Sequence, residues 1–306
     1  MKSLISVIIP TYNRSNKIIR AVKSVLCQTY DNVEIIIIDD YSTDDTQNII
    51  KNFIDTNNLS NTIRYVKNEN NIGNAAARNV GIKLIKGEFV AFLDDDDFWL
   101  PDKLQKQINL ILEKKAKFVS CGTIWFEENN FLKVNISDSK KRGSFEKGGP
   151  TSTWLLHKSV FDKIGNFDER FPSAVDGEFL VRLNKNFDVY FVQDYLYVHF
   201  YYKEQISSSN DKKIKGFELL LDKHKNIFKN YELSSLYFKL AIFHIFNNKR
   251  KFGYIVKSIQ LKPKLRNMLI FLICLLPMVL TKKILNKYLD FKKYPRSFAG
   301  RYGDKN

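Results

Sequence analysis

The chain contains the stretch Phe89-Val90-Ala91-Phe92-Leu93-Asp94-Asp95-Asp96-Asp97, in which five apolar residues lead into four consecutive carboxylates. The apolar run has the length and composition of a buried β-strand. Carboxylates packed this closely repel one another unless a cation or hydrogen-bond donors offset their charge. Magnesium and manganese prefer oxygen ligands, often one or two carboxylates together with substrate phosphates. The stretch therefore predicts a strand that ends at a metal site; the alternative is a solvated acidic loop that caps the next helix.

The residues around this stretch alternate between two kinds of apolar pattern. Continuous apolar runs typical of buried strands also lie at Leu4–Ile9, Val33–Ile38 and Ile63–Val66. Apolar residues at helical spacing lie at Ser15–Leu26, Thr43–Ile54 (with Ser42 or Thr43 as N-cap), Ala75–Ile85 and Pro101–Leu112. This alternation predicts an α/β fold with a mainly parallel central sheet and helices on both faces. Ligands of such sheets bind beyond the carboxyl ends of the strands, so the residues after each strand are candidates for the site.

The second half of the chain follows a different pattern. Strand-like runs occur at Phe118–Thr123, Val189–Val192 and Tyr195–Tyr201, and after residue 209 the apolar spacing becomes helical. We therefore expect an α/β domain over residues 1–210 and a helical, basic C-terminal region over residues 211–306.

Net charge and cysteine content limit the classes of protein to which the chain can belong. The 306 residues carry a formal net charge of +16, and the excess of Lys and Arg is heaviest after Asp211. A strongly basic chain suits anionic partners such as nucleic acid, phosphorylated substrates or a lipid surface. The three cysteines, Cys27, Cys121 and Cys274, have no paired spacing, which argues against a disulfide framework and a zinc site and fits a reducing compartment.

Two apolar segments bear on the relation to a membrane. The run Leu4–Ile9 is too short for a signal peptide and leads into Pro-Thr-Tyr-Asn rather than a cleavage site. The segment Met268–Leu280 is shorter than the ~20 residues that span a bilayer, and it contains Pro277. A buried core helix and insertion into a membrane interface are both open interpretations. Basic residues bracket the segment and suit an anionic inner leaflet: Lys262, Lys264, Arg266, Lys282, Lys283 and Lys287.

Polar residues also follow the other predicted strands. Asp39 and Asp40 end the second strand, where a carboxylate can accept a hydrogen bond from the ring N–H of a base such as uracil. The alternative is an Asx-turn before the next helix. Residues 10–14 follow the first strand and offer backbone amides and an aromatic ring to a nucleoside. Gly73 and Arg78 flank the start of the third helix, where an arginine can pair bidentately with a phosphate.

These segments, in this order and spacing, resemble the signature of family 2 glycosyltransferases, which have the GT-A fold. The matching motifs are Pro10-Thr11-Tyr12-Asn13-Arg14, Asp39-Asp40-Tyr41-Ser42-Thr43-Asp44, Asn71-Ile72-Gly73 with Ala77-Arg78-Asn79, and Asp94-Asp95-Asp96-Asp97. The resemblance covers roughly residues 2–209, so residues 1–210 would form the catalytic GT-A domain. It implies an inverting transfer of sugar from a nucleotide-sugar donor, UDP-hexose or UDP-N-acetylhexosamine, to a saccharide acceptor.

The resemblance assigns roles to the residues that match. It implies that Asp96 is the direct ligand of a Mg2+ or Mn2+ ion, and that Asp94 is a second ligand that also contacts ribose. It implies that Asp40 contacts the base. The other donor-binding residues that it implies are Pro10, Thr11, Tyr12, Asn13, Gly73, Arg78 and Asp95.

The catalytic base comes from a later segment. Phe167-Asp168-Glu169 and Val175-Asp176-Gly177-Glu178 resemble the acceptor-side motifs of the family, in which the aspartate that maps to Asp176 is the base. The chain departs from the pattern at Val175, where an acidic residue is usual, and Glu178 is the fallback base. Gln205 stands where a histidine is expected, and His199 is interpreted as a packed strand residue.

Other classes of protein fit the sequence less well. The turn at residues 10–14 has no glycine, so a nicotinamide-binding Gly-x-Gly-x-x-Gly motif is absent, and no P-loop motif occurs. A non-catalytic basic assembly subunit or a nucleic-acid-binding protein is the alternative, although basic residues are not interleaved with aromatic ones as in nucleic-acid modules. We expect no nucleic-acid partner. We expect a polyprenyl-diphosphate-linked saccharide acceptor, as in O-antigen or capsule biosynthesis, and a cytoplasmic, peripheral location on the inner face of the membrane.

Overall fold

The structure is a computed structural model that describes residues 2–127, 130–135, 144–201, 209–249 and 251–293. The chain divides into two compact units. The first comprises residues 1–128 and 134–202, and the second comprises residues 129–133 and 203–306. Gln205 lies outside the described residues.

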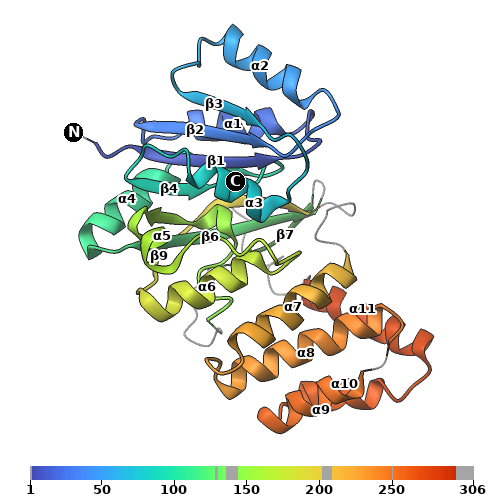
Figure 1. The fold of residues 1–306 in the computed structure, drawn as a ribbon. Helices are drawn as coiled ribbons and strands as arrows, with labels where there is room; N and C mark the ends of the chain where they lie inside the picture. The colour runs from blue at the N-terminus through green and yellow to red at the C-terminus, as the bar shows by residue number, and fades with distance from the viewer. Residues whose placement is uncertain (1, 128–129, 136–143, 202–208, 250, 294–306) are drawn as a thin grey trace, which may run out of the picture. The chain divides into compact units, whose positions relative to one another are not determined.

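The first unit is built on a central sheet (Figure 1). Eight strands follow one another across it in the order β3-β2-β1-β4-β8-β6-β9-β5. Their bounds are β1 (Ile5–Thr11), β2 (Val33–Asp39), β3 (Ile63–Lys67), β4 (Phe89–Phe92), β5 (Phe98–Trp99), β6 (Phe118–Glu127), β8 (Leu155–His157) and β9 (Tyr190–Tyr201), and a further strand, β7, spans Asn130–Asn135.

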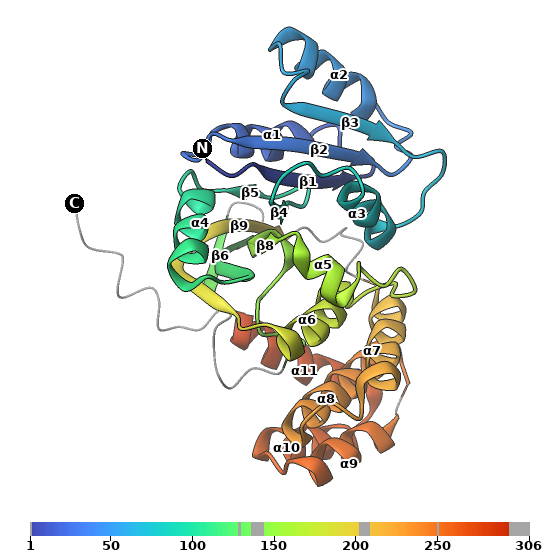
Figure 2. The ribbon, with the colours of Figure 1, turned by 60° about the vertical axis from the view of Figure 1, so that its left-hand side comes forward.

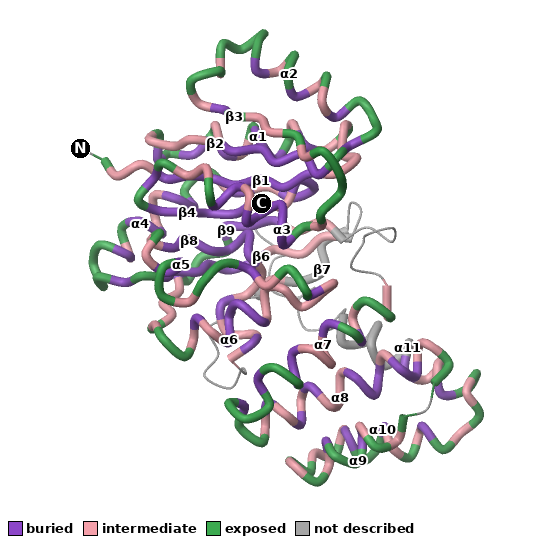
Figure 3. The backbone as a smooth tube through the Cα atoms, in the orientation of Figure 1, coloured by how far each residue is buried: buried purple, intermediate pink, exposed green. Residues whose placement is uncertain are grey.

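The strands β1 to β4 are parallel, as the sequence predicts. All seven residues of β1 are buried, and Figure 3 shows the same continuous burial along the neighbouring part of β2 and β4. Strands covered on both faces need continuous apolar sequence rather than alternation. The register places Thr11 beside Asp39, so the ends of β1 and β2 lie side by side.

Helices cover both faces of this sheet. Side chains of α1 (Ile18–Leu26), α2 (Thr46–Thr56) and α4 (Lys103–Lys114) pack with Ile5, Val7 and Ile9 of β1. Side chains of α3 (Asn74–Ile82), α5 (Ser159–Ile164) and α6 (Val175–Asn186) pack in a second cluster that contains Ile8. Successive side chains of β1 therefore pack into two separate hydrophobic cores, one on each face of the sheet.

The second half of the sheet departs from the expected pattern. Strand β8 runs antiparallel between β4 and β6, and β5 is antiparallel to β9, so the complete sheet is mixed. The runs Val189–Val192 and Tyr195–Tyr201 form the single strand β9, whose pairing with β6 is irregular near Gly122. The helix expected from Thr43 begins at Thr46 with Asp45 as N-cap, so neither Ser42 nor Thr43 caps it. Asp44 accepts the Thr46 amide instead.

The second unit contains five described helices, drawn in orange and red in Figure 2. They are α7 (Asn210–His224), α8 (Asn230–Phe246), α9 (Phe252–Leu261), α10 (Leu265–Ile273) and α11 (Met278–Lys293). The apolar segment Met268–Leu280, for which a buried core helix was one of the two open interpretations, is divided between α10 and α11 around Pro277. No described helix combines the length and the apolar character that crossing a bilayer requires.

Candidate active site

The acidic loop after β4 is anchored by its last residue. Asp97 is fully buried, and its carboxylate accepts hydrogen bonds from the Tyr197 hydroxyl and from the Phe200 amide, the latter at 2.9 Å. The His199 Nδ1 atom lies 3.0 Å from the same carboxylate. Burial by itself lowers the pKa of His199, but the Asp97 carboxylate outweighs that effect and the pKa lies above its ordinary value. His199 is thus both packed, with its ring 4.4 Å from that of Trp125, and bound to Asp97.

The three preceding carboxylates lie close together, with Arg78 beside Asp94 and Arg14 beside Asp95. Burial, and then repulsion from Asp96, raise the pKa of Asp95 to about 8, although Thr11 and Arg14 act against this shift. Burial, and then repulsion from Asp97 and Asp94, raise the pKa of Asp96 to about 6. These acids therefore favour any ligand that brings positive charge to them.

A divalent cation fits this site. Among the described residues, no set of three or more His, Cys, Asp or Glu side chains is arranged to hold a metal. Mg2+ and Mn2+ are often held by one or two carboxylates while substrate phosphates supply further oxygens. Asp96 and Asp94 are two such carboxylates, and burial together with the neighbouring acids raises the pKa of Asp96.

Arg78 links the acidic loop to the start of α6. Its Nη2 atom donates to Asp94 Oδ1 at 2.7 Å, and its Nη1 atom lies 3.7 Å from Asp176 Oδ1. The Arg78 side chain is only 4% exposed. The predicted phosphate-binding arginine is therefore paired with two carboxylates, and the structure brings together three residues that are widely separated in the sequence.

Asp176, the predicted base, lies at the N-terminus of α6 and is partly exposed. It lies in the first turn of α6, its side chain is 33% exposed, and its Oδ2 atom accepts the Thr151 amide at 3.2 Å. The surrounding protein withdraws water from the carboxylate and raises its pKa, while Arg78 acts in the opposite direction. The helix N-terminus also favours the charged form.

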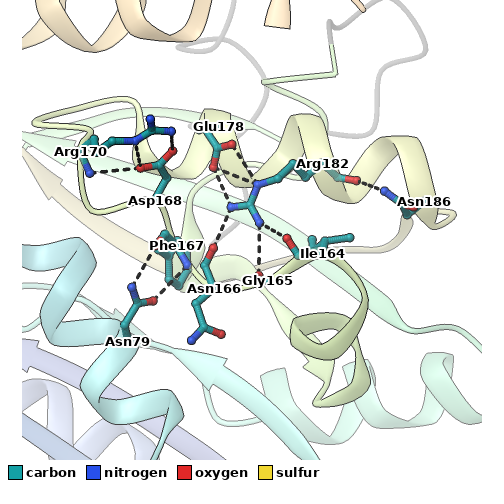
Figure 4. Close-up of polar contacts among 10 residues, drawn as sticks. All are labelled: Asn79, Ile164, Gly165, Asn166, Phe167, Asp168, Arg170, Glu178, Arg182 and Asn186. Atoms are coloured by element: carbon teal, nitrogen blue, oxygen red, sulfur yellow. Dashed lines mark hydrogen bonds and ion pairs between the residues drawn. The ribbon is translucent and has the colours of Figure 1, made fainter. Parts of the chain in front are cut away.

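Glu178, the fallback base, has a different environment (Figure 4). It is 1% exposed, and its carboxylate accepts three hydrogen bonds from Arg182 at 2.7–3.1 Å. Arg182 also donates to the carbonyl oxygens of Ile164, Gly165 and Asn166. This ion pair ties α6 to the segment that leads into Phe167, and it argues against Glu178 as a proton acceptor for a substrate.

Asn79 holds the same segment from the other side. Its amide donates to the Phe167 carbonyl at 2.9 Å and accepts the Phe167 amide at 3.0 Å (Figure 4). The Phe167 ring in turn lies 5.7 Å from the Arg78 guanidinium carbon. Asp168 is engaged by Arg170 at 2.6 and 2.9 Å, so it has a local partner of its own. The role of Asn79 in positioning Phe167 is not evident from the sequence, although Asn79 follows Arg78 in the matched motif.

The loops predicted to contact the nucleoside are held in place by hydrogen bonds to Asp39 and Asp40. Asp39 accepts the Ser42 amide at 2.7 Å, which is the Asx-turn alternative, and also binds the Tyr65 hydroxyl. Asp40 accepts the amides of Ile72 and Gly73 at 2.9 and 2.8 Å, and the Asn68 side chain at 3.0 Å. A carboxylate accepts about four hydrogen bonds, so this count leaves one acceptor position for a base.

The residues after β1 border these loops. Asn13 adopts a left-handed φ of 52°, and its side chain accepts the Thr43 amide at 2.8 Å. Pro10 and Thr11 are buried at the end of β1, and Tyr12 is half-buried beside them. The structure thus places the predicted donor residues of β1 next to the loop that follows β2, with the acidic loop after β4 on the neighbouring strand.

Comparison with known proteins identifies the family of this chain. Residues 6–168, more than half of the chain, match glycosyl transferase family 2. The chain belongs to this family. Membership decides against the non-enzymatic basic subunit and the nucleic-acid-binding protein that composition left open.

Two Escherichia coli relatives of this glycosyltransferase carry specific names. It is 33% identical over 181 residues to WfaP, described as UDP-Glc:alpha-D-GlcNAc-diphosphoundecaprenol beta-1,3-glucosyltransferase, covering 59% of this chain and 69% of WfaP. It is 40% identical over 116 residues to WfgD, which has the same description, covering 38% of this chain and 44% of WfgD. The similarity to WfgD therefore concerns less than half of either protein.

Solved structures support the GT-A fold of this glycosyltransferase. Staphylococcus aureus TarS, residues 1–349 in complex with UDP-GlcNAc, superposes with a TM-score of 0.60 at 24% identity, covering 88% of this chain and 78% of that chain. The Pyrobaculum calidifontis mannosyltransferase PcManGT, in complex with GDP-Man and Mn2+, gives a TM-score of 0.61 at 16% identity, covering 95% and 81%. At these identities the likeness establishes the fold alone.

Proposed function

We propose that this glycosyltransferase inverts the anomeric centre as it moves a hexose or N-acetylhexosamine from a UDP-sugar to a saccharide acceptor, with a divalent metal ion as cofactor. The observation that carries the proposal is that Asp176 and Asp94 share the guanidinium of Arg78. In this proposal Asp176 serves the acceptor and Asp94 serves the diphosphate, and both carboxylates contact the Arg78 guanidinium. Inversion needs the base on the face of the sugar opposite the leaving diphosphate.

Asp176 is the base in this proposal. Its carboxylate takes the proton of the acceptor hydroxyl while the hydroxyl oxygen bonds to the anomeric carbon, and the bond from that carbon to the diphosphate oxygen breaks with its electron pair. Burial raises the pKa of this carboxyl, and Arg78 and the N-terminus of α6 act in the opposite direction by favouring its ionised form. Glu178 is reserved for the ion pair with Arg182.

The residues of the acidic loop would bind the metal and the donor. Asp96 and Asp94 would hold the Mg2+ or Mn2+ ion, which when bound supplies Lewis-acid stabilisation of the charge on the leaving diphosphate. Asp95, Tyr12, Gly73 and the remaining acceptor position of Asp40 face the nucleoside in this proposal. Pro10, Thr11 and Asn13 shape the turn beside it.

The relatives guide the choice of substrates. The names of WfaP and WfgD specify a UDP-glucose donor and a GlcNAc-diphosphoundecaprenol acceptor. We extend this chemical class to the present chain and propose a saccharide linked to polyprenyl diphosphate, in the assembly of O-antigen, capsule or another surface polysaccharide. Such an acceptor is embedded in lipid, so the enzyme is proposed to act at the inner face of the cytoplasmic membrane as a peripheral protein.

The proposal is tested with Asp176→Asn, which keeps the size of the side chain but removes a proton acceptor. We expect kcat for sugar transfer to fall at least ~100-fold while UDP affinity changes far less than kcat, since general-base catalysis contributes about 100- to 10,000-fold. The matched control is Asp162→Asn, because Asp162 is an exposed acid in the first turn of α5. Equal kcat values for the two variants would remove Asp176 from the mechanism.

A further inference from the structure

Exposed apolar side chains are concentrated in one part of the second unit. Among the described residues, thirteen large hydrophobic side chains are classed as exposed, and seven of them lie between residues 265 and 280. The seven are Leu265, Met268, Leu269, Leu272, Leu275, Val279 and Leu280. Large exposed apolar patches mark interaction sites, whereas single exposed hydrophobic residues are ordinary.

Four of these residues form one stripe along α10, which we call the leucine face: Leu265, Met268, Leu269 and Leu272. At 100° per residue they span an arc of roughly 100° on the helix. The opposite side of α10 is buried, with Asn267 at 0%, Ile270 at 3% and Cys274, which follows the helix, at 2% exposure. The helix is therefore fixed to its unit by one side while it presents a second apolar side outward.

The polar contacts of α10 keep this orientation. Asn267 donates to the Ser258 hydroxyl at 2.8 Å, and Ser258 exchanges hydrogen bonds with Ser234 of α8. Ile270 and Cys274 pack with Ile255 of α9 and Ile245 of α8. Turning the leucine face inward would bury apolar area but break this buried polar cluster, so the exposed stripe is a built feature of the unit.

Basic residues are abundant in the region that contains the leucine face. Residues 211–306 contain 22 of the 49 Lys and Arg residues but only 6 of the 33 Asp and Glu residues, so this region accounts for the whole net charge of +16. Lys264 is the N-cap residue of α10, and Arg266 lies about 100° from Leu265 on the helix, with its guanidinium carbon 4.2 Å from the Phe238 ring. Lys262 and Lys283 are exposed nearby in sequence. The side chain of Lys287 lies outside the described residues.

We propose that the leucine face of α10, together with Val279 and Leu280 of α11, docks the enzyme onto the surface of an anionic phospholipid bilayer. An apolar stripe with basic residues at its borders has the two properties that a helix lying in a membrane interface needs. The nine residues of α10 measure roughly 13 Å, so the whole stripe reaches the interface when the helix lies flat. The biological purpose of this docking, access to a lipid-linked acceptor, rests on the proposed function.

A second copy of the chain is the main rival occupant. Two copies meeting through this face would bring two strongly basic regions together with few acidic residues to offset them, which opposes association. An anionic bilayer supplies both the apolar interior and the opposite charge. The charge pattern therefore favours lipid over self-association.

The test is flotation of the full chain with vesicles of phosphatidylglycerol and phosphatidylethanolamine. We expect wild type to float with these vesicles, and to float at least ~10-fold less with phosphatidylcholine vesicles or in high salt. The double variant Leu269→Ser/Leu272→Ser should bind anionic vesicles at least ~10-fold more weakly. Leu112→Ser is the matched control, because Leu112 of α4 is 65% exposed in the first unit, and it should float as wild type does.

A second variant and a second measurement keep the test decisive. Lys262→Glu/Lys283→Glu retains the apolar stripe and should lose the preference for anionic over neutral vesicles. Unchanged flotation of both double variants, or no flotation of wild type, would overturn the proposal. So would a wild-type dimer in solution that the leucine variant converts to monomer. Flotation uses no substrate. A wild-type protein that binds vesicles but transfers no sugar would therefore refute the proposed function without contradicting the proposed docking surface.

Discussion

At the level of single residues, the two acids in the first turn of α6 are distinguished by their partners. Sequence motifs place Asp176 and Glu178 two positions apart and leave both available as a base. The structure separates them, because Glu178 is paired with Arg182 whereas Asp176 is one-third exposed beside Arg78. The partner of Glu178 is four residues away on the helix, a spacing that predicts ion pairs. That signal was present in the sequence.

This distinction gives a prediction for Glu178 and Arg182. Each of Glu178→Gln and Arg182→Gln should lower the free energy of unfolding by about 3 kcal/mol, because each leaves the other charge without its buried partner. Both should reduce kcat without changing the shape of its pH profile. The double variant should be at least as stable as the less stable of the two single variants, since both changes remove one shared interaction.

Urea unfolding and kcat measured against pH check this prediction. If Glu178 were the base, Glu178→Gln would abolish transfer and remove the acidic limb of the profile, while Arg182→Gln would stay active.

Other positioning residues could not be derived from the sequence. Asn79 holds Phe167 across 88 residues, and Asp97 binds Tyr197 across 100 residues. Such contacts depend on which strands and loops become neighbours, and a local pattern carries no information about that. The four acids of the loop look equivalent in sequence, yet the last of them anchors β9 and only the first three border the proposed donor site.

Among the elements, the loop between β3 and α3 depends on one side chain. Asp40 accepts three N–H groups from Asn68, Ile72 and Gly73, and Gly73 has a φ of 87° that favours glycine. The loop is therefore held by a carboxylate that was predicted only to contact a base.

Replacement of Asp40 should loosen this loop. Asp40→Ala is expected to lower the free energy of unfolding by about 2 kcal/mol, because three partly buried N–H groups lose a charged acceptor. The KM for the donor should rise in parallel. Asp31→Ala is the control, since Asp31 is an exposed acid with a surface ion pair. A change in KM with no loss of stability would indicate contact with the base alone.

Elements with strong periodicity were predicted well, and short ones were not. The four parallel strands and α1 to α4 lie within a few residues of their predicted positions. Strand β8 has three residues and β5 has two, too few to show a pattern, and both exist because longer strands lie beside them. The apolar segment Met268–Leu280, for which a buried core helix was one of two open interpretations, is not one helix, because the chain turns around Pro277 between α10 and α11.

For the whole molecule, the two units can be observed separately. All three tryptophans, Trp99, Trp125 and Trp154, lie in the first unit, so their fluorescence reports on the catalytic part alone. The boundary near Asn210 remains our proposal for the end of the catalytic domain.

Tryptophan fluorescence allows a test of metal binding against pH. The pKa values of Asp95 and Asp96, about 8 and about 6, lie above their unfolded values. The stability that these groups contribute is fully present below their ordinary pKa of 3.8 and falls as pH rises, until about 6 for Asp96 and about 8 for Asp95. Mn2+ with UDP binds the ionised forms, so it should raise Tm by several degrees at pH 8 and by less at pH 6.

Asp96→Ala is the control in this thermal unfolding experiment. It should abolish the Mn2+-dependent rise and reduce transfer to background. An equal rise in Tm for the variant and the wild type would show that the metal binds elsewhere.

The shared guanidinium of Arg78 has a thermodynamic consequence. One cation offsets both Asp94 and Asp176, so the charge state at either carboxylate changes the free energy of the other. Such an energetic coupling between two sites is reciprocal. Whatever factor a cation at Asp94 contributes to the acidity of Asp176, a proton on Asp176 must contribute equally to the affinity for that cation. Binding of the cation at Asp94 and ionisation of Asp176 are therefore thermodynamically linked.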